Sequence, residues 1–342
     1  MLLRVEHECW PIAGGFTISR GTKNAADVVV ATIELAGLRG RGECVPYGRY
    51  DETIENVIAT IESQRDWLHG ALLDAGRVAA VRDELGLRVR AGAARNALDC
   101  ALWDLESKLT ATPVWSLAGL GEPHSLTTAF TLSLGTPESM AAVACAAAGR
   151  PLLKLKLGGT QDVESANGDI ARLVAVRRVA PNSRLVVDAN EGWNVKDLPR
   201  LLSACCDQGV ELVEQPLRED DDSALIGMPR DVPLCADESA HDLSCLKDGG
   251  LADRYDAINI KLDKTGGLTE ALAMARAAQS SGLSVMVGCM VATSLAMAPA
   301  MLVAQHAAIV DLDGPLLLSE DREAGLRFEG SEVFPPSSSL WG

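Results

Sequence analysis

Residues 152–157 read LLKLKL, and this stretch decides how the rest of the chain is interpreted. Successive side chains on a β-strand point to opposite faces, so Lys154 and Lys156 share one face while the leucines share the other. Taken alone, the pattern favours an ordinary amphipathic strand with its lysines in water. Downstream, however, short apolar runs start roughly every 25 residues, and each ends in a charged residue. That period fits one strand, one helix and two loops of a β/α barrel.

Eight such strands can be counted along the chain. They are expected at residues 126–134, 152–157, 185–188, 211–214, 233–237, 257–261, 284–288 and 308–311. The C-terminal ends of barrel strands line the mouth of the active site, so the charged residues that end them should gather there. These residues are Lys154, Lys156, Asp188, Glu214, Asp237, Lys261, Asp311 and Asp313. In a closed ring of eight, strands two and six face each other, which puts Lys156 opposite Lys261 with the acids of strands three to five between them.

The chain before the barrel has a different pattern. Three strand-like runs and two helical patterns are expected there, with a polar, Gly-rich loop between the first two strands. The strands are expected at 2–9, 27–35 and 40–45, the loop at 11–23, and the helices at 51–68 and 93–105. The boundary with the barrel is expected between Pro113 and Pro123. The predicted fold class is therefore α/β, a β/α barrel preceded by a small α+β domain.

The composition limits the kinds of partner. A net charge of −16 argues against nucleic acid, because phosphate binding requires a basic patch. The start, MLLRVEHECW, lacks the apolar core of a signal peptide, and no run is long enough to span a membrane. Nine cysteines without any C-x-x-C spacing predict neither a zinc site nor a disulfide framework. We therefore expect a cytoplasmic protein that acts on a small molecule, with no nucleic-acid or membrane partner.

Asp188, Glu214 and Asp237 end adjacent strands and form an all-oxygen set. A single acid at a strand end more often caps a helix or forms a salt bridge, but three in succession on a barrel rim favour a metal site. Oxygen ligands suit a hard cation, and Mg²⁺ commonly keeps open positions for water and substrate. We expect one Mg²⁺ per active site. The neighbouring Asn190 and Glu238 either orient these ligands or cap loops, and the sequence does not decide between the two.

The two opposed lysines imply a reaction. Burial and a nearby positive charge lower the pKa of a lysine, and Lys154, together with the cation, supplies that charge. A neutral lysine can take a proton from carbon, and the protonated lysine opposite can return one to the other face. A divalent cation on the substrate carboxylate would stabilise the enediolate formed when the α-proton leaves. The residues therefore predict a 1,1-proton transfer, racemisation or epimerisation, with Lys156 and Lys261 as the acid–base pair.

Five motifs, K-x-K, D-A-N, E-Q-P, A-D-E-S and N-I-K-L-D-K-T-G-G, occur in this order along the barrel. With GECVPYGRY before them and DLDGP after them, they resemble the muconate-lactonizing subgroup of the enolase superfamily, and within it the dipeptide epimerases, most closely the bacterial L-Ala-D/L-Glu epimerases. The resemblance covers essentially the whole chain. It implies a modified TIM barrel (119–313) and an N-terminal α+β capping domain (1–118) that the C-terminal segment (314–342) completes. It also implies Asp188, Glu214 and Asp237 as metal ligands and Lys156 and Lys261 as catalytic residues, supported by Lys154.

The resemblance also implies residues that bind the substrate. Asp311 and Asp313 match the D-x-D with which dipeptide epimerases hold the substrate α-ammonium group, and two carboxylates suit that task because charge-assisted hydrogen bonds are strong. The alternative for DLDG is a turn or a helix cap. Arg20 matches the arginine that meets the substrate side-chain carboxylate in glutamate-specific members, although Lys23 or Arg49 could serve instead.

The predicted function is a Mg²⁺-dependent epimerase acting on the α-carbon of the C-terminal residue of a dipeptide. L-Ala-D/L-Glu is the expected substrate, and the family implies a role in murein-peptide metabolism. Thr131, on the first barrel strand, either touches the substrate backbone or packs. An N-acylamino-acid racemase or a muconate-type cycloisomerase would leave Asp311 and Asp313 without a ligand. A non-catalytic, metal-dependent binder of acidic peptides would not need both lysines. The resemblance allows a homo-oligomer, but no interface can be read from the sequence.

Overall fold

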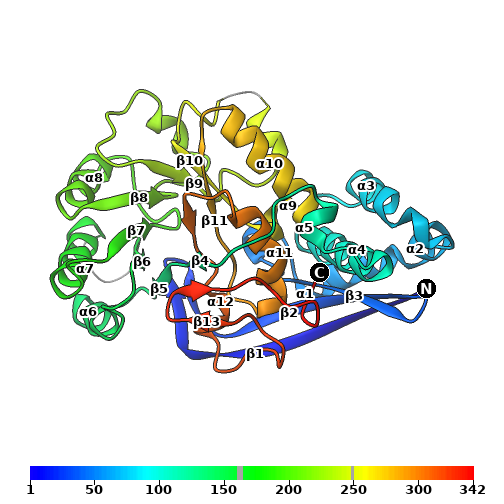
Figure 1. The fold of residues 1–342 in the computed structure, drawn as a ribbon. Helices are drawn as coiled ribbons and strands as arrows, with labels where there is room; N and C mark the ends of the chain where they lie inside the picture. Colours follow the sequence, from blue (N-terminus) through cyan, green and yellow to red (C-terminus); the bar gives the residue numbers. More distant parts are fainter. Residues whose placement is uncertain (160–164, 248–249) are drawn as a thin grey trace.

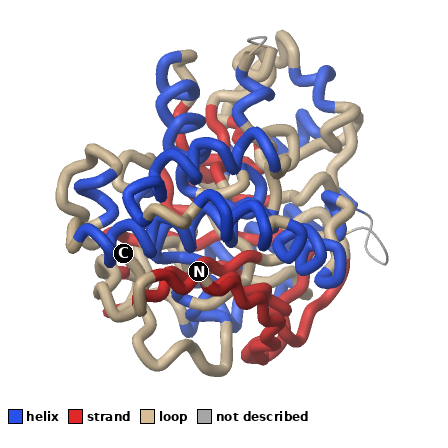
Figure 2. The backbone as a smooth tube through the Cα atoms, turned by 90° about the vertical axis from the view of Figure 1, so that its right-hand side faces the viewer, coloured by secondary structure: helices blue, strands red, loops and turns tan. Residues whose placement is uncertain are grey.

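The structure has two parts side by side, a barrel surrounded by helices and a smaller α+β domain (Figure 1). It is a computed structural model that describes residues 1–159, 165–247 and 250–342. When the molecule is turned by 90°, strands run across its lower half from the N-terminus, and helices with further strands among them lie above (Figure 2). This is the predicted fold class, with the α+β domain first and the barrel second.

The α+β domain contains a three-stranded antiparallel sheet covered by helices. Its elements are β1 (Leu2–Ile18), β2 (Gly21–Leu35), β3 (Leu38–Cys44), η1 (Gly48–Tyr50), α1 (Ile54–Ser63), α2 (Arg65–Ala71), η2 (Ala75–Arg77), α3 (Val78–Arg88), α4 (Ala93–Thr110) and α5 (Val114–Leu117). Both predicted helices are confirmed, the first as α1 and α2 and the second as α4. Helix α4 lies so close to β3 that a Cβ on Gly40 or Gly42 would come within 2.1 Å of a helix carbonyl oxygen. These two glycines therefore permit the packing.

The predicted loop at 11–23 is wrong, because β1 and β2 continue through most of it as one long hairpin. Gly14 and Gly15 both have a positive φ, and the register between the two strands shifts at this point. Glycine adopts that backbone conformation at little cost, so an irregularity in the ladder absorbs the Gly-rich stretch. The hairpin reaches the barrel, where Leu134 N donates a hydrogen bond of 2.9 Å to Thr17 O.

All eight predicted barrel strands are present, in sequence order and parallel. They are β5 (Phe130–Leu132), β6 (Leu152–Lys156), β7 (Arg184–Asp188), β8 (Val210–Glu214), β9 (Leu234–Ala236), β10 (Ala257–Ile260), β11 (Ser284–Val287) and β12 (Ile309–Val310). The two ends of the sheet meet at a hydrogen bond of 2.8 Å from Ala129 N to Val310 O. Inside the ring, one buried residue from or beside each strand packs into a common core: Ala129, Leu152, Val186, Leu212, Cys235, Ala257, Met286 and Ile309. The sheet therefore curls into a filled barrel.

Helices cover the outside of most of the barrel (Figure 1). They are α6 (Pro137–Ala146), α7 (Ser165–Val179), α8 (Leu198–Asp207), α9 (Leu262–Thr265), α10 (Leu268–Ser280), α11 (Ser294–Ala304) and α12 (Gly314–Leu317). After β8 and β9 the described chain forms the short 3₁₀ turns η3 (Asp222–Leu225) and η4 (Leu243–Leu246) instead of α-helices. The barrel is thus a modified one, as expected.

The C-terminal segment runs back along both parts. Its strands β13 (Phe328–Glu329) and β14 (Glu332–Val333) form a small sheet with β4 (Leu126–Thr127), which the sequence placed in barrel strand one. At the end of the chain, Trp341 Nε1 donates to Cys100 O at 3.0 Å, and Gly342 N donates to Asp104 Oδ1 at 2.8 Å. Both acceptors belong to α4, so the segment ties the barrel to the helices of the α+β domain.

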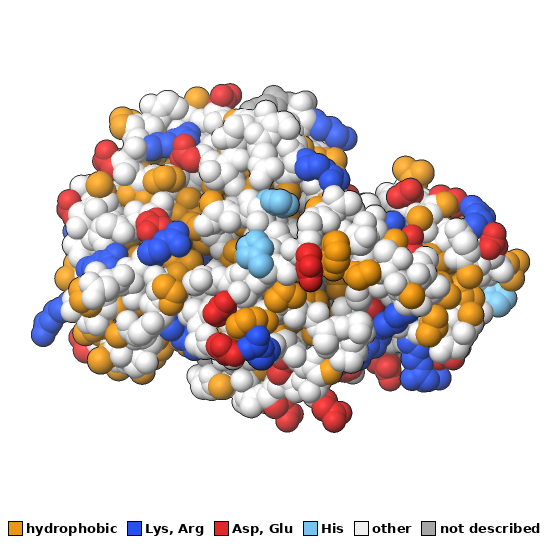
Figure 3. Space-filling view, viewed as in Figure 1, with side chains coloured by type: hydrophobic (Ala, Val, Ile, Leu, Met, Phe, Trp, Pro, Cys, Tyr) orange, Lys and Arg blue, Asp and Glu red, His pale blue; other side chains and the backbone are white. Residues whose placement is uncertain are grey.

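The surface carries charged side chains of both signs, interspersed over the face in Figure 3. Among the helices that the structure describes, none has the length and apolar character needed to cross a membrane.

Candidate active site

The structure confirms the predicted orientation of the lysines on β6. The leucines beside them pack in the core between sheet and helices, while Lys154 and Lys156 point inward, with side chains 1% and 8% exposed. The parallel register pairs Lys156 with Asp188, and Asp188 with Glu214, so these groups end neighbouring strands at one level. Strand β10 lies four places from β6 in the ring of eight, so Lys261, directly after β10, approaches from the opposite side.

Lys154 forms the centre of an ion-pair network. Its Nζ lies 2.7 Å from Glu214 Oε2, 2.7 Å from Asp311 Oδ2 and 3.2 Å from Asp188 Oδ2. Lys156 Nζ lies 2.5 Å from the same Asp188 oxygen. The two lysines of β6 therefore connect acids on three other strands.

Two other lysines hold the carboxylate of Asp237. Lys261 Nζ lies 2.7 Å from its Oδ2, and Lys264 Nζ lies 2.6 Å from its Oδ1. Sequence reasoning did not assign Lys264 a role. The available signal was its position one helical turn after Lys261 in the N-I-K-L-D-K-T-G-G motif, but that spacing alone does not show which carboxylate it reaches.

The ion pairs set the pKa values of the site. Burial lowers the pKa of Lys154 and Lys261, but the surrounding carboxylates outweigh it and raise the pKa of both. Burial likewise opposes ionisation of Asp188 and Asp237, yet the lysines hold the pKa of each below its usual range. The pKa of Glu214 is raised by burial and by the charge of Asp188. The lowered pKa expected from the sequence for an acid–base lysine is therefore not found for Lys261 in the protein alone, because its neighbours are anions, whereas Lys154 is positively charged as expected.

The acids that end β7 and β8, and Asp237 just after β9, fit a hard cation by their chemistry. They are buried, contribute only oxygen, and lie on adjacent strands. Glu214 Oε2 and Asn190 Oδ1 are buried acceptors without a directed hydrogen bond. As the side chains stand, no three acids, histidines or cysteines of the described chain surround one point closely enough for a metal ion, since the acids turn towards lysines. A cation at this place would have to displace those ammonium groups.

Asp311 and Asp313 follow β12 and lie against the first barrel strand. Thr131 N donates to Asp313 Oδ2 at 2.6 Å, and Thr131 Oγ1 lies 3.5 Å from Asp311 Oδ1. Burial, and then the negative charge of Asp311, raises the pKa of Asp313 to about 7. The structure thus places Thr131 where it orients the two acids, and it places the acids as a closely spaced, incompletely neutralised pair.

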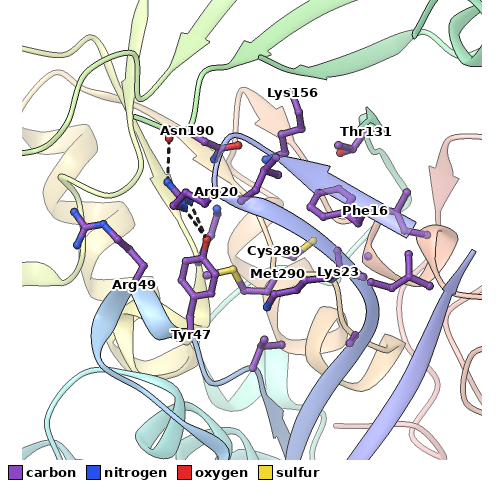
Figure 4. Close-up of a pocket in the computed structure, with 18 of the residues that line it drawn as sticks. Phe16, Arg20, Lys23, Tyr47, Arg49, Thr131, Lys156, Asn190, Cys289 and Met290 are labelled. Atoms are coloured by element: carbon purple, nitrogen blue, oxygen red, sulfur yellow. Dashed lines mark hydrogen bonds between the residues drawn. The ribbon is translucent and has the colours of Figure 1, made fainter. Parts of the chain in front are cut away.

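Several of these groups line one cavity of about 420 Å³, which falls in the range of small-molecule sites, while Lys154, Asp188 and Glu214 lie behind its wall (Figure 4). Its polar wall contains Thr131, Lys156, Asn190, Asp237, Glu238, Lys261, Asp311 and Asp313. The facing wall is largely apolar and comes from the β1–β2 hairpin and from the chain around β11 and α12: Ile12, Phe16, Ile18, Met290, Val291 and Leu317. The hairpin therefore covers the charged mouth of the barrel.

The guanidinium of Arg20 is fully engaged by protein groups. It donates to Tyr47 Oη and Glu238 Oε1, both at 2.8 Å, and to Asn190 O at 3.0 Å, and it lies 3.3 Å from Glu191 Oε2 (Figure 4). These bonds fasten the tip of the hairpin to two loops at the barrel mouth. Asn190 and Glu238 thus anchor Arg20, and the backbone N–H of Asn190 also donates to an oxygen of the preceding aspartate.

Of the other two cations considered for the hairpin side, only one is free. Arg49 donates to Glu191 at 2.9 and 3.0 Å and to Glu219 at 3.1 Å. Lys23 lines the cavity with its Nζ 5.4 Å from the centre of the Tyr47 ring, and within the described residues it has no ion pair or side-chain hydrogen bond. Burial lowers the pKa of Lys23. Lys23 is exposed at the edge of the cavity, so its charge is available to an anion that enters.

The chain matches two known protein families. Residues 2–119 match the family described as mandelate racemase/muconate lactonizing enzyme, N-terminal domain, and residues 138–336 match the enolase C-terminal domain-like family. The chain is 43% identical over 333 residues to the L-Ala-D/L-Glu epimerase of Escherichia coli, a match that covers 97% of this chain and 98% of that protein. The chain belongs to the dipeptide epimerase family of the enolase superfamily. It is accordingly an isomerase.

Other members of the superfamily resemble this dipeptide epimerase over nearly its whole length. It is 42% identical to the N-acetyl-D-glutamate racemase of a Pseudoalteromonas species, over 92% of this chain and 95% of that one. An enolase family member from Agrobacterium tumefaciens with bound sodium and L-Ala-L-Glu shares 50% identity, with a TM-score of 0.92 and 99% of each chain covered. A dipeptide epimerase from Enterococcus faecalis, complexed with Mg and L-Leu-L-Tyr, shares 29% identity with a TM-score of 0.89, covering 99% and 98%.

Proposed function

We propose that this chain epimerises the α-carbon of the C-terminal residue of dipeptides, with L-Ala-D/L-Glu as its substrate. The observation that carries the proposal is the pair of lysines that enter one cavity from opposite strands, Lys156 and Lys261. An α-carbon held between them is open to a proton donor or acceptor on each face. Removal of the α-proton from one face and delivery of another proton to the opposite face invert the configuration of the α-carbon.

The lysines act in complementary protonation states. In its neutral form, one takes the α-proton onto Nζ, and the ammonium of the other gives a proton to the opposite face of the same carbon. Asp188, 2.5 Å from Lys156, and Asp237, 2.7 Å from Lys261, hold the two Nζ atoms in place. Lys154 keeps a permanent positive charge beside Lys156 and binds three of the acids.

We propose Mg²⁺ as the cofactor, held by Asp188, Glu214 and Asp237. When bound, a divalent cation stabilises the negative charge that develops on the substrate carboxylate as the α-proton leaves. Asp237 is the carboxylate that most raises the pKa of Lys261, so its use as a metal ligand would reduce that effect. The lysine chemistry and the metal site are therefore coupled through the same three acids.

The ends of the dipeptide have matching groups in the cavity. We propose that Asp311 and Asp313, oriented by Thr131, bind the substrate α-ammonium, which would neutralise the buried pair. For a glutamate side chain, Arg20 and Lys23 are the candidate cations. Arg20 already has four protein partners, so we propose that it secures the hairpin and that Lys23 contributes the free charge.

A second candidate function is racemisation of an N-acylated glutamate, favoured by the 42% identity to an N-acetyl-D-glutamate racemase. The proton chemistry would be the same, since it needs only the lysines and the metal ligands. The two functions differ at the amine, which is cationic in a dipeptide and neutral in an N-acyl amino acid. The acid pair at Asp311 and Asp313 favours the dipeptide, because Lys154 pairs with Asp311 alone and a neutral amide would leave the buried Asp313 without a cation.

We also propose that the protein works in the cytoplasm on peptides released from the cell wall, as the likeness to L-Ala-D/L-Glu epimerases suggests. A homo-oligomer is compatible with this role, and the dipeptide is the only small-molecule partner that the proposal requires.

The deciding experiment follows the glutamyl α-proton by NMR in D₂O with enzyme and MgCl₂. L-Ala-L-Glu and N-acetyl-L-glutamate are tested side by side. Loss of the α-proton signal together with formation of the L,D diastereomer supports the proposal. Inversion of N-acetyl-glutamate alone would establish the second candidate function. Exchange with neither compound, at an Mg²⁺ concentration that saturates the protein, would contradict both.

A further inference from the structure

We propose that Lys264 is a positioning residue that fixes Asp237 for its cation, although it does not itself enter the cavity. The proposal rests on the proposed function only in taking Asp237 as a metal ligand. It concerns the segment from Asn259 to Lys264, which runs from the end of β10 into the single turn of α9. This segment carries Lys261 into the cavity and, on either side of it, two groups that hold neighbouring carboxylates.

The ammonium of Lys264 is completely used by the protein. Its Nζ donates to Asp237 O at 2.5 Å, to Asp237 Oδ1 at 2.6 Å and to Asn259 O at 2.9 Å. A lysine ammonium has three protons, so no donor is left for a ligand. The side chain is fully buried and does not line the cavity. These contacts pin both the backbone and the side chain of Asp237 to the end of the next strand.

The two oxygens of Asp237 are thereby made unequal. Oδ1 faces Lys264 behind the cavity wall, and Oδ2 faces Lys261, which lines the cavity. A cation can exchange with Lys261 at Oδ2 while Lys264 keeps Oδ1. Lys264 would therefore make Asp237 a single-oxygen ligand with a preset direction, and it would offset one negative charge of the acid cluster.

Asn259 likewise holds one carboxylate oxygen of Glu214, the acid on the strand next to that of Asp237. Its Nδ2 donates to Glu214 Oε1 at 2.7 Å, which leaves Oε2 paired only with the ammonium of Lys154, 2.7 Å away. The amide fits because residue 288 is glycine: a Cβ there would lie 2.7 Å from Asn259 Nδ2. One segment thus holds two of the three acids by the oxygen that faces away from the proposed cation.

The test measures Mg²⁺ binding directly. Isothermal titration calorimetry with MgCl₂ compares the full-length protein with Lys264→Met, which fills a similar volume without the ammonium. Lys196→Met, at an exposed lysine between β7 and α8, is the matched control. If Lys264 positions Asp237, the Kd for Mg²⁺ of Lys264→Met rises about 10- to 100-fold, the range seen when partners of metal ligands are removed. Removing only a competing positive charge would tighten binding instead, so an unchanged or lower Kd overturns the proposal.

Two further measurements separate positioning from general support of the fold. The melting temperature is taken in EDTA and in MgCl₂, because a ligand that binds the folded state raises it. A purely structural role lowers both values and leaves the Mg²⁺-dependent rise as in the wild type, which would contradict the proposal. A smaller rise supports it. If Lys264→Met does not fold, Lys264→Arg carries the test, with weaker Mg²⁺ binding supporting the proposal and wild-type binding overturning it.

The outcome is independent of the proposed reaction. If the wild type exchanges no α-proton but its Mg²⁺ affinity depends on Lys264 as described, the reaction is wrong and the positioning role stands. If L-Ala-L-Glu is epimerised and Lys264→Met binds Mg²⁺ normally, the reaction stands and the positioning role fails.

Discussion

At the scale of single residues, the two cavity lysines should be separable by stereochemistry. Because each serves one face of the α-carbon, Lys156→Ala and Lys261→Ala are each expected to slow epimerisation by at least about 100-fold. Each variant should still exchange the α-proton of one diastereomer, without inversion, through its remaining lysine. NMR in D₂O with L-Ala-L-Glu and L-Ala-D-Glu measures both rates. Variants that retain exchange with the same diastereomer would show that the lysines do not act on opposite faces.

The roles of Lys23 and Arg20 can be distinguished by comparing substrates with and without a side-chain carboxylate. If Lys23 receives the glutamate carboxylate, Lys23→Met should lower kcat/KM for L-Ala-L-Glu by about 10- to 100-fold, the value of a charge-assisted hydrogen bond, and should change L-Ala-L-Leu little. Arg20→Met loosens the hairpin tip from Glu238 and Tyr47, so it should lower kcat/KM for both dipeptides alike. A loss confined to L-Ala-L-Glu in Arg20→Met would assign the carboxylate to Arg20.

The residues that could be predicted from the sequence are those whose position follows from strand alternation. Lys154 and Lys156 point inward because the leucines between them must be buried, and the acids follow because parallel strands end on one rim. Lys264 could not be predicted, and Lys23 was predicted only as an alternative to Arg20. Their roles depend on which atoms already have partners, and that depends on contacts with Asp237 and Tyr47, which no local pattern encodes.

At the scale of elements, helix α10 depends on a cap from the other domain. Asp99 of α4 accepts hydrogen bonds from Thr269 N at 3.0 Å and Thr269 Oγ1 at 2.6 Å, in the first turn of α10. Gly267 allows this approach, since a Cβ there would lie 2.5 Å from Asp99. Asp99→Ala removes the cap and buries two unpaired donors, so the free energy of unfolding should fall by about 1–3 kcal/mol.

Urea denaturation followed by circular dichroism measures this loss, with Asp99→Asn as the control because its amide oxygen can still accept. Equal stability of Asp99→Ala and the wild type would show that the cap is unimportant. The strand–helix repeat of the barrel predicts a helix after the sixth strand, but it does not predict the cap of that helix. The partner, some 170 positions earlier in the chain, could not be inferred.

The same limit explains where element prediction succeeded and failed. The barrel strands were found because each combines an apolar run with a charged end at a regular spacing. The hairpin across 11–23 was missed because Gly14 and Gly15 interrupt the alternation of its apolar residues, and its strands are stabilised by pairing with each other and by covering the barrel mouth. A polar, Gly-rich composition predicts a loop reliably only where no other strand pairs with the segment.

At the scale of the whole molecule, the two parts are joined by buried polar groups that titrate. Asp263, at the start of α9, accepts hydrogen bonds from Val45 N and Asn96 Nδ2 of the α+β domain, both at 2.9 Å. Burial raises the pKa of Asp263 from its usual 3.8 to about 7. Between these values the folded protein binds one proton more than the unfolded chain, so this group makes the free energy of unfolding fall as pH rises.

The expected loss is complete above about pH 7 and amounts to up to roughly 4 kcal/mol, from a shift of about three pKa units. Asp263→Asn keeps an acceptor oxygen for both hydrogen bonds and cannot ionise. Its stability relative to the wild type should therefore increase steadily from pH 4 to pH 8, and urea denaturation at several pH values measures the difference. A difference that stays constant with pH would show that Asp263 is ionised in the folded protein throughout, and that its two hydrogen bonds compensate for burial at the junction of the two parts.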